Sequence, residues 1–334
     1  MSSFDEIFGG LKKMKVAVIG DVMLDTYWWG HVERISPEAP VPIVSLERKE
    51  QRLGGAGNVA LNVASLGAET FLFSVVGDDE DAVILKDLLQ RSNVEGKHLV
   101  HSNNRLTTNK TRIMSRNQQM LRLDSEQTDD IISQDEQRLI DRFESFLKVE
   151  KPDIVVFQDY NKGVLTLAVI ESILALCQTH RILTAVDPKR KNFFSYKGVD
   201  VFKPNLKEVK DGLNLLVEEI SGSVLSKMHS ELKAVLNHEI SFITLSERGV
   251  FYQKNQHGHI LPSHIRNISD VSGAGDTVIA VASLVYAYTR DFKIAAEMAN
   301  IAGGLVCEEV GTVPINKDRL MEECKQLLKF EPLL

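Results

Sequence analysis

The stretch that decides the fold class is Lys15-Val16-Ala17-Val18-Ile19-Gly20-Asp21. It is a short run of β-branched and other apolar residues that ends in Gly and Asp, as is typical of a buried strand in a parallel sheet. Similar runs follow helix-like segments at residues 154–157, 183–187 and 242–245. This alternation predicts an α/β fold, in which helices cover both faces of a central, mostly parallel sheet.

Length and composition fit one globular domain, residues 1–334. The chain is 43% hydrophobic and 25% charged, and 39 Lys and Arg against 46 Asp and Glu give a net charge of -7. This sign disfavours a sequence-independent nucleic-acid binder. No segment approaches the roughly 18 to 20 apolar residues of a membrane span, and the start Met1-Ser2-Ser3-Phe4-Asp5-Glu6 is acidic, unlike a secretory signal. We therefore expect a cytoplasmic protein with no membrane partner.

Three of the expected strands end at or just before an acidic residue, namely Asp21, Asp159 and Asp187. Ligands of open α/β sheets bind beyond the carboxyl ends of the strands, so these aspartates are expected to gather around one crevice. The alternative is that each one caps the turn that follows it.

Two segments depart from the α/β rhythm. Residues 27–49 carry three prolines among alternating apolar positions, and residues 109–124 intersperse apolar residues with Arg and Gln. Both patterns favour strands of a small separate sheet. We expect this sheet to form a lid over the crevice.

The segment with most chemical information is Asp270-Val271-Ser272-Gly273-Ala274-Gly275-Asp276-Thr277, which precedes an apolar, helix-like run. Glycines let a ligand approach the backbone, and a helix start presents unpaired N–H groups, so the junction suits an anion such as a phosphoryl group. Asp276, in the first turn, would take the proton of an attacking hydroxyl. The alternative is an acidic residue that favours the positive end of the helix.

A second glycine cluster, Leu53-Gly54-Gly55-Ala56-Gly57-Asn58, precedes an expected helix at residues 59–66. It lacks the Lys of a phosphate-binding Walker loop, and it does not follow the first strand as a dinucleotide fingerprint does. It suits close approach to a polyhydroxylated ligand, with Asn58 supplying amide donors and acceptors. A plain helix start is the alternative.

Asn205 and Glu208 lie three residues apart after the expected strand end at Phe202. Their oxygens suit the water shell of Mg²⁺, but Asn-x-x-Glu is also a variant of the helix capping box. Arg112, Arg116 and Lys162 are cations near the expected lid and crevice. They would hold a phosphate of the substrate, or they are ordinary exposed charges.

As a whole, the chain resembles the ribokinase-like (PfkB-type) carbohydrate kinases. The two glycine segments, Gly54–Asn58 and Asp270–Thr277, carry this resemblance at the expected ends of the chain. It looks closest to the kinase portion of bifunctional heptose enzymes, which phosphorylate D-glycero-β-D-manno-heptose 7-phosphate at the anomeric hydroxyl. The strings that carry the closer resemblance are Gly20-Asp21-Val22-Met23-Leu24-Asp25, Arg34-Ile35-Ser36-Pro37-Glu38-Ala39-Pro40-Val41-Pro42, Ser115-Arg116-Asn117-Gln118-Gln119 and Asp159-Tyr160-Asn161-Lys162-Gly163. It spans roughly residues 12 to 320.

The resemblance implies a role for each matched position. It makes Asp276 the catalytic base and the amides of Gly273, Ala274 and Gly275 the anion hole. The implied sugar and phosphate contacts are Asp25, Gly54, Gly55, Asn58, Arg116, Asn117 and Lys162. The positions implied on the side of Mg²⁺ and ATP are Asn205, Glu208, Ser246 and Asn300, with no direct protein cage around the metal. The sequence departs from the family pattern at two positions, where Ser272 replaces a usual Thr and Gln158 replaces a usual Ser. Both departures are mild, because neither removes a required functional group.

The resemblance also implies ATP and a phosphosugar as substrates, Mg²⁺ as cofactor, and a homodimer that pairs through the lids. A nucleotidyltransferase segment with a His-x-Gly-His motif is not found in the sequence, so we expect a kinase without that second domain. The alternatives are a related kinase for fructose 6-phosphate or a nucleoside, and a non-catalytic heptose-phosphate sensor. A dinucleotide-dependent oxidoreductase is disfavoured, because Gly-x-Gly-x-x-Gly is missing after the first strand.

Overall fold

The computed structural model describes residues 4–116 and 118–328. Among these residues, nine strands form the central sheet in the order β15-β14-β13-β12-β11-β10-β1-β4-β6. The strands from β13 to β6 are parallel, and β14 and β15 add an antiparallel edge. The predicted α/β fold with a mostly parallel sheet is confirmed.

The elements have these bounds. The strands of the central sheet are β1 (Lys15–Gly20), β4 (Glu69–Phe73), β6 (Val94–Glu95), β10 (Ile154–Gln158), β11 (Leu183–Asp187), β12 (Val201–Phe202), β13 (Ile240–Thr244), β14 (Val250–Lys254) and β15 (His257–Leu261). The remaining strands are β2 (Val22–Ile35), β3 (Pro42–Gly55), β5 (Val75–Gly77), β7 (Val100–Ser102), β8 (Asn109–Ser115) and β9 (Gln118–Ser125). The helices are α1 (Phe4–Leu11), α2 (Ala56–Ser65), α3 (Glu80–Arg91), α4 (Ser133–Val149), α5 (Leu167–His180), α6 (Leu206–Gly212), α7 (Gly222–Leu236), α8 (Ala274–Thr289), α9 (Phe292–Val306) and α10 (Lys317–Leu327), with 3₁₀ turns η1 (Arg190–Asn192) and η2 (Ser246–Arg248).

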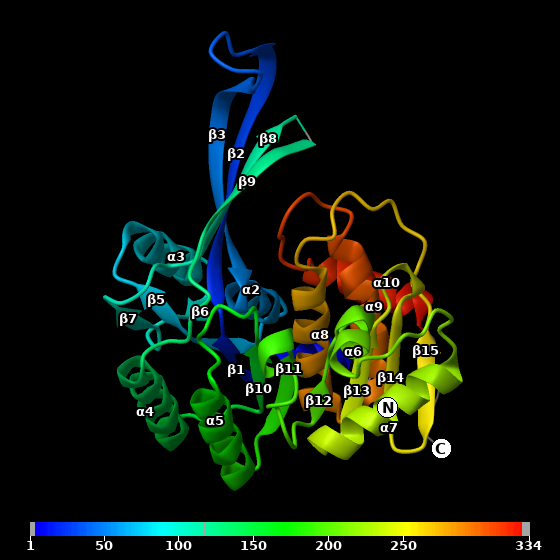
Figure 1. Ribbon diagram of the computed structural model, residues 1–334. Helices are drawn as coiled ribbons and strands as arrows, with labels where there is room; N and C mark the ends of the chain where they lie inside the picture. The colour runs from blue at the N-terminus through cyan, green and yellow to red at the C-terminus, as the bar shows by residue number, and fades with distance from the viewer. Residues whose placement is uncertain (1–3, 117, 329–334) are drawn as a thin grey trace.

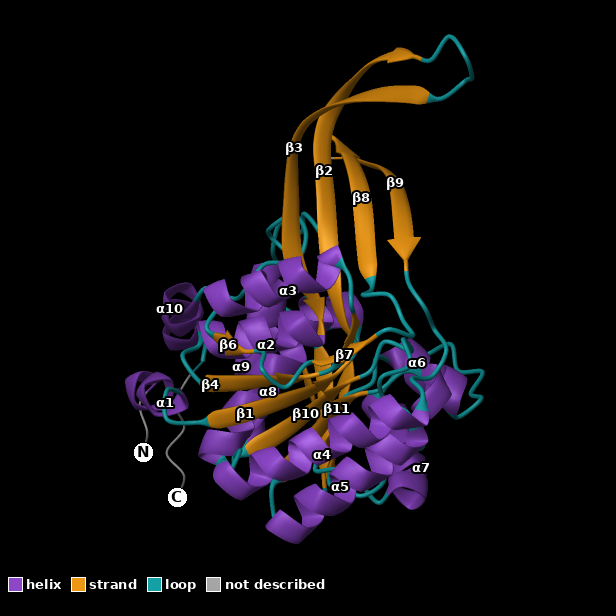
Figure 2. Ribbon diagram, turned by 90° about the vertical axis from the view of Figure 1, so that its left-hand side faces the viewer, coloured by secondary structure: helices purple, strands orange, loops and turns teal. Residues whose placement is uncertain are grey.

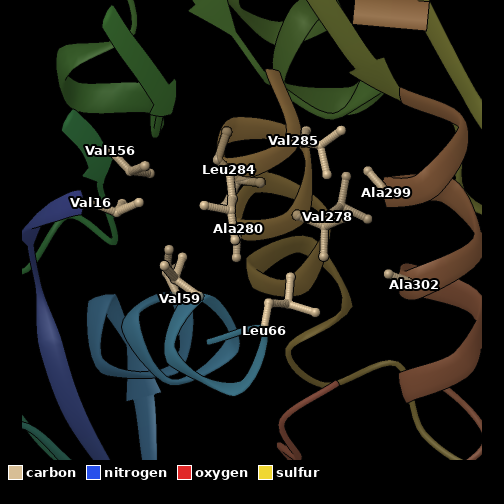
Figure 3. Packing of buried hydrophobic residues seen from close by; sticks show 14 of the residues in the cluster. Val16, Val59, Leu66, Val156, Val278, Ala280, Leu284, Val285, Ala299 and Ala302 are labelled. Carbon is tan, nitrogen blue, oxygen red and sulfur yellow. The ribbon is translucent and has the colours of Figure 1, made fainter. Parts of the chain in front are cut away.

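Helices cover both faces of the central sheet, as Figure 2 shows. The apolar residues of β1 alternate between two hydrophobic cores, because successive side chains of a strand point to opposite faces. Val16 and Val18 pack with α2, α8 and α9, whereas Ala17 and Ile19 pack with α4 and α5. Figure 3 shows the first core, in which Leu284 of α8 faces Val16 and Val156, while Val278 on the other side of α8 faces Ala299 and Ala302 of α9. No helix in the described ranges is long and apolar enough to cross a membrane.

A separate four-stranded sheet projects from this body, with the order β3-β2-β8-β9 (Figures 1 and 2). Both segments that the sequence singled out, residues 27–49 and 109–124, lie in it. The small separate sheet is therefore confirmed as part of the fold. Its strands are longer than predicted: β2 begins at Val22, directly after β1, and β3 continues to Gly55.

Helix α2 also begins earlier than residue 59, at Ala56. Gly55 has φ +58°, a conformation that strongly favours glycine, and it turns the chain from β3 into the helix. The Ala56 N–H donates to the Asp21 carbonyl oxygen at 2.9 Å, which fixes the helix start against the end of β1. The glycine cluster is thus the first turn of the helix as well as the segment before it.

Candidate active site

The carboxyl ends of β1 and β10 carry two buried aspartates that organise a loop. Asp21 accepts hydrogen bonds from the backbone N–H groups of Tyr160, Lys162 and Val164, at 2.8, 3.1 and 3.0 Å. Burial and the neighbouring Asp159 raise the pKa of Asp21 to about 6, against the effect of these donors. Asp159 accepts from the Tyr196 hydroxyl at 2.7 Å. These two carboxylates therefore hold the loop after β10 rather than face a ligand.

The start of α8 provides backbone donors for an anion. Gly273 precedes the helix with φ +78°, and no side chain of the described residues caps it. The Ala274 N–H donates to the Val271 carbonyl at 3.3 Å. Within residues 4–116 and 118–328, the N–H groups of Gly273, Gly275 and Asp276 have no protein acceptor. Such a helix start is suited to bind a phosphoryl group.

Asp276 lies in the first turn of α8 with its side chain only 2% exposed. Its Oδ2 accepts from Asn58 Nδ2 at 2.8 Å, and its Oδ1 accepts from Gln158 Nε2 at 3.0 Å and from the Tyr160 hydroxyl at 2.7 Å. Burial raises the pKa of Asp276 from 3.8 to about 7, although the donors Asn58 and Tyr160 oppose the shift. A carboxylate with this pKa can accept a proton near neutral pH and release it again.

Buried Lys203 and Asp187 and the partly buried Lys189 form a charged cluster beside the same turn. Lys203 Nζ contacts Asp187 Oδ2 at 2.9 Å, and Lys189 Nζ is 3.6 Å from Asp187 Oδ1. Although burial opposes ionisation, the two lysines hold the pKa of Asp187 below its usual value. A Cβ on Gly275 would lie 3.8 Å from Lys203 Nζ, so this ammonium group adjoins the free amides of α8.

The predicted sugar-binding aspartate, Asp25, lies at the base of β2. It forms an ion pair with Arg112 of β8, with 2.6 Å between Oδ1 and the guanidinium. A Cβ on Gly54 would lie 2.5 Å from Asp25 Oδ2, so a glycine is required for the carboxylate to occupy this position. The side chain of Thr312 is 3.5 Å from the same oxygen. Asp25 is thus held in place by residues from three parts of the chain.

Asn58 is brought directly to Asp276, so its side chain serves the carboxylate as well as any sugar contact. A Cβ on Gly273 would lie 2.6 Å from Asn58 Nδ2. The two glycine clusters of the sequence therefore meet in space. Gly55, by contrast, shapes the turn into α2.

Asn205 and Glu208 form the capping box that the sequence left open as an alternative. Asn205 Oδ1 accepts from the Glu208 N–H, and Glu208 Oε2 accepts from the Asn205 N–H, both at 2.8 Å. Glu208 Oε1 also contacts Lys189 Nζ at 2.5 Å. Because their oxygens already have protein donors, the pair fits contact with a hydrated Mg²⁺ through its waters better than direct ligation. No group of three or more His, Cys, Asp or Glu side chains in the described chain is arranged to hold a metal.

Ser246 and Asn300 lie further along the carboxyl edge. Thr244, two residues before Ser246, forms a parallel bridge with Asn205, which brings the two predicted nucleotide-side segments together. Ser246 begins η2 with φ +55° and is exposed. Asn300 of α9 donates to the Pro262 carbonyl at 2.8 Å, so it holds the loop that follows β15.

The predicted phosphate contacts are not all close to Asp276. Arg116 is exposed at the turn between β8 and β9, where its N–H donates to the Gly30 carbonyl. Gly30 is five residues from Asp25 along β2, which corresponds to about 17 Å. Lys162 Nζ forms an ion pair with Glu126 at 2.6 Å, so its charge is already compensated. Asn117 lies outside the described residues.

The sequence patterns did not identify Lys189 and Lys203 as site residues, nor the hydrogen bond that Gln158 donates to Asp276. Lys203 directly precedes Pro204-Asn205, and its position at the end of a strand was the available signal. A buried lysine cannot be recognised from sequence alone, because its counter-ion, Asp187, comes from a different strand.

Taken together, a parallel sheet covered on both faces, an uncapped helix start and an adjoining buried carboxylate form an α/β site that is suited to phosphoryl transfer. The sequence profile of the pfkB family of carbohydrate kinases matches residues 13–319. The chain therefore belongs to this family.

Two relatives are similar to most of this chain. Bifunctional protein HldE from Aliarcobacter butzleri is 38% identical over 314 residues, which cover 93% of this chain and 64% of the relative. HldE from Chromohalobacter salexigens is 39% identical over 92% of this chain and 62% of its own length. The chain thus spans a little under two thirds of both relatives.

Two solved structures are similar in fold. Phosphofructokinase-2 from Escherichia coli, in complex with substrates and products, superimposes with a TM-score of 0.78, at 18% identity over 94% of this chain and 99% of that one. Ribokinase from Arabidopsis thaliana, complexed with ribose and ATP, gives a TM-score of 0.71, at 14% identity over 93% of this chain and 99% of that one. The ribokinase-like fold is therefore confirmed.

Proposed function

We propose that the protein transfers the γ-phosphoryl group of ATP to the anomeric hydroxyl of D-glycero-β-D-manno-heptose 7-phosphate, giving the 1,7-bisphosphate and ADP. The observation that carries the chemistry is the buried carboxylate of Asp276 beside amides of α8 that have no acceptor among the described residues. The choice of sugar is supported by the resemblance of the strings around Asp25, Arg116 and Asp159 to heptose kinases, and by the identity to the HldE proteins.

In the proposed reaction, Asp276 takes the proton of the acceptor hydroxyl. The freed oxygen forms a bond to the γ-phosphorus, while the bond between this phosphorus and the bridging oxygen breaks and its electron pair leaves with ADP. A base of pKa about 7 matches this role, because it is substantially ionised at neutral pH and basic enough to hold the proton.

Negative charge on the transferred phosphoryl group would be stabilised by hydrogen-bond donors that are already oriented. The N–H groups at the start of α8 point to the anion site, and the Lys203 ammonium adjoins Gly275. Fixed donors of this kind stabilise a transition state without reorganising during the reaction. Mg²⁺, when bound with ATP, neutralises phosphate charge, and Asn205 and Glu208 would contact its waters.

The acceptor would lie between Asp276 and the base of the small sheet, which we propose acts as a lid. Asp25, Gly54 and Asn58 surround this region and would bind the sugar hydroxyls. Closure of the lid would exclude water and so suppress hydrolysis of ATP.

For the 7-phosphate, Arg112 is better situated than Arg116. Its guanidinium is already at Asp25, whereas Arg116 lies at the far turn of the lid. Arg116, together with Asn117, would reach a sugar phosphate when the lid bends or a second copy supplies its own lid. Lys162 would do so after release from Glu126.

We also propose a homodimer that pairs through the lids. Met120, Leu121 and Leu123 of the edge strand β9 are 39, 52 and 48% exposed, an apolar row that pairing would cover. Because ATP is the proposed phosphoryl donor, we place the reaction in the cytoplasm.

The experiment is an ATP-consumption assay with Mg²⁺ and a panel of heptose 7-phosphate, fructose 6-phosphate, ribose and adenosine. Phosphorus NMR identifies the product. We expect a heptose 1,7-bisphosphate signal and much weaker turnover of the other acceptors. Preferred turnover of fructose 6-phosphate or adenosine would refute the heptose assignment and leave the kinase chemistry intact.

A further inference from the structure

The two oxygens of Asp276 have unequal surroundings. Oδ1 accepts two hydrogen bonds, from Gln158 Nε2 and from the Tyr160 hydroxyl, whereas Oδ2 accepts one, from Asn58 Nδ2. An ionised carboxylate oxygen offers about two acceptor directions, so Oδ1 is saturated and Oδ2 retains one. The remaining direction on Oδ2 is where a substrate hydroxyl can donate.

Gln158 is fully buried and bridges two carboxylates. Its Nε2 is 3.0 Å from Asp276 Oδ1 and 3.4 Å from Asp187 Oδ2. The opposite orientation of the amide would direct its oxygen at both carboxylates, so the donor orientation is fixed by charge. Within the described residues, Gln158 Oε1 has no hydrogen-bond partner, a loss that a purely structural glutamine would not require.

Tyr160 is held so that its hydroxyl reaches Asp276. Its backbone N–H donates to Asp21, which also accepts from the N–H groups of Lys162 and Val164 in the same loop. Burial raises the pKa of the Tyr160 phenol well above 10, and Asp276 adds to this effect. The hydroxyl therefore stays protonated, and stays a donor, over the whole pH range in which a kinase is assayed.

The charged groups around Asp276 come from three elements. Asp187 at the end of β11 raises its pKa, and Lys203, which follows β12, lowers it. Lys189, after β11, is also within the electrostatic range of Asp276. Tyr160 donates to Asp276, whereas Gln158 Nε2 also reaches Asp187, so removal of the Tyr160 hydroxyl changes Asp276 with the smaller effect on other charges.

We infer that Gln158 and Tyr160 are positioning residues for Asp276: by saturating Oδ1 they keep the carboxylate ionised and leave Oδ2 to take the proton of the acceptor hydroxyl. This inference rests on the proposed function of Asp276 as the base. It assigns a role to the position at which the sequence departs from the Ser that is usual in the related kinases. Neither residue needs to contact the substrate.

The test uses Gln158→Met and Tyr160→Phe, which remove one donor each at similar side-chain size. A donor to the charged form lowers the pKa of a carboxylate, so its loss raises that pKa. We expect the acid limb of kcat/KM to move from near pH 7 upward by roughly half to one unit in each variant. We also expect kcat to fall about 10-fold or more at pH 7, with KM for ATP and sugar within about 2-fold.

The matched control is Tyr196→Phe. The Tyr196 hydroxyl also donates at 2.7 Å to an aspartate, but to Asp159 rather than to Asp276. It should leave the acid limb in place. Thermal unfolding of each variant shows that it is folded, and if Gln158→Met is unfolded, Tyr160→Phe decides alone.

The outcomes separate the inference from the function on which it rests. An upward shift of the acid limb in the donor variants, absent from Tyr196→Phe, supports the inference. A wild-type limb and kcat in folded Tyr160→Phe overturn it. If Asp276→Asn is inactive while the donor variants behave as wild type, the positioning role fails and the base stands. If Asp276→Asn retains full turnover, the proposed function itself fails.

Discussion

The starts of α6 and α8 share one feature, an acidic residue in the first turn, but they differ in the residue that precedes the helix. Each helix has an acidic residue at its third position, Glu208 in α6 and Asp276 in α8. In α6 the preceding Asn205 accepts from the Glu208 N–H, and Glu208 turns back to close the box. In α8 the corresponding residue is Gly273, which has no side chain to do this.

The difference shows how a helix start is made available for a ligand. Without a capping side chain, the N–H groups of Gly275 and Asp276 have no acceptor among the described residues, and the carboxylate of Asp276 turns inward to donors on other segments. The capping box of α6 provides acceptors for the backbone N–H groups of Asn205 and Glu208 and so stabilises the start of the helix. One glycine thus separates a structural helix start from a candidate catalytic one.

The largest expected effect comes from Asp276→Asn, which removes the proposed base and keeps the shape of the side chain. We expect kcat to fall by about 10²- to 10⁴-fold, as for other general bases. In the wild type, activity should rise with pH through about 7, because burial raises the pKa of Asp276 and the ionised form is required. A pH profile of kcat/KM measures this. An acid limb near pH 4 would contradict the role of a buried base.

The next largest effect is expected from Gly273→Ala, which adds a Cβ at the start of α8 without adding a capping group. The added Cβ would meet Asn58 Nδ2 at 2.6 Å, and φ +78° disfavours any side chain by about 1–2 kcal/mol. Displaced amide donors lower kcat by about 10²-fold or more. Steady-state kinetics measure the loss. Unchanged kcat in a folded variant would show that these amides do not serve the reaction.

A smaller effect is expected from Glu208→Gln. Glutamine can still complete the capping box, so stability should be retained, whereas the charge next to Lys189 is lost. If Glu208 contacts the waters of Mg²⁺, the concentration of Mg²⁺ needed for half-maximal rate should rise about 10-fold or more. Titration of Mg²⁺ at fixed ATP measures this. An unchanged requirement would restrict Glu208 to its structural role.

The smallest effect is expected from a matched pair of cap deletions, Asn205→Ala and Asn316→Ala. Asn316 caps α10 by accepting from the Arg319 N–H at 3.0 Å. Each deletion should lower the free energy of unfolding by about 1 kcal/mol, as measured by denaturant titration. We expect Asn205→Ala to raise the KM for Mg-ATP and Asn316→Ala to leave it unchanged. Equal KM values would assign Asn205 to the cap alone.

Sequence periodicity was sufficient to predict most of the fold. Buried strands such as β1 and β10 have continuous apolar sequences. The segments 27–49 and 109–124 do not follow this alternation of apolar strands and helices, and this difference indicated the small sheet. The strand bounds were less predictable. Residues 22–26 continue β1 in hydrophobicity, so the sequence alone does not show that they leave the central sheet at Asp21.

The candidate site was predictable where one short segment contains both the glycine turn and the carboxylate, as at residues 270–277. It was not predictable where partners come from distant segments. Asp276 meets Gln158 across 118 positions and Asn58 across 218, and Lys203 finds its counter-ion on a neighbouring strand. Asp21 was expected at the crevice, but its oxygens bind backbone amides, which no residue pattern reveals.

The continuity of β2 and β3 with the central body makes the small sheet a lever arm. Both strands are 14 residues long, and β2 starts directly after Asp21 while β3 ends at the first turn of α2. A strand of that length spans about 46 Å, so a tilt of about 5° at its base moves the far turn by about 4 Å. The same tilt moves Asp25 by less than about 1 Å. A movement of the far turn of the small sheet is therefore reduced to a much smaller displacement at Asp25, the proposed sugar contact.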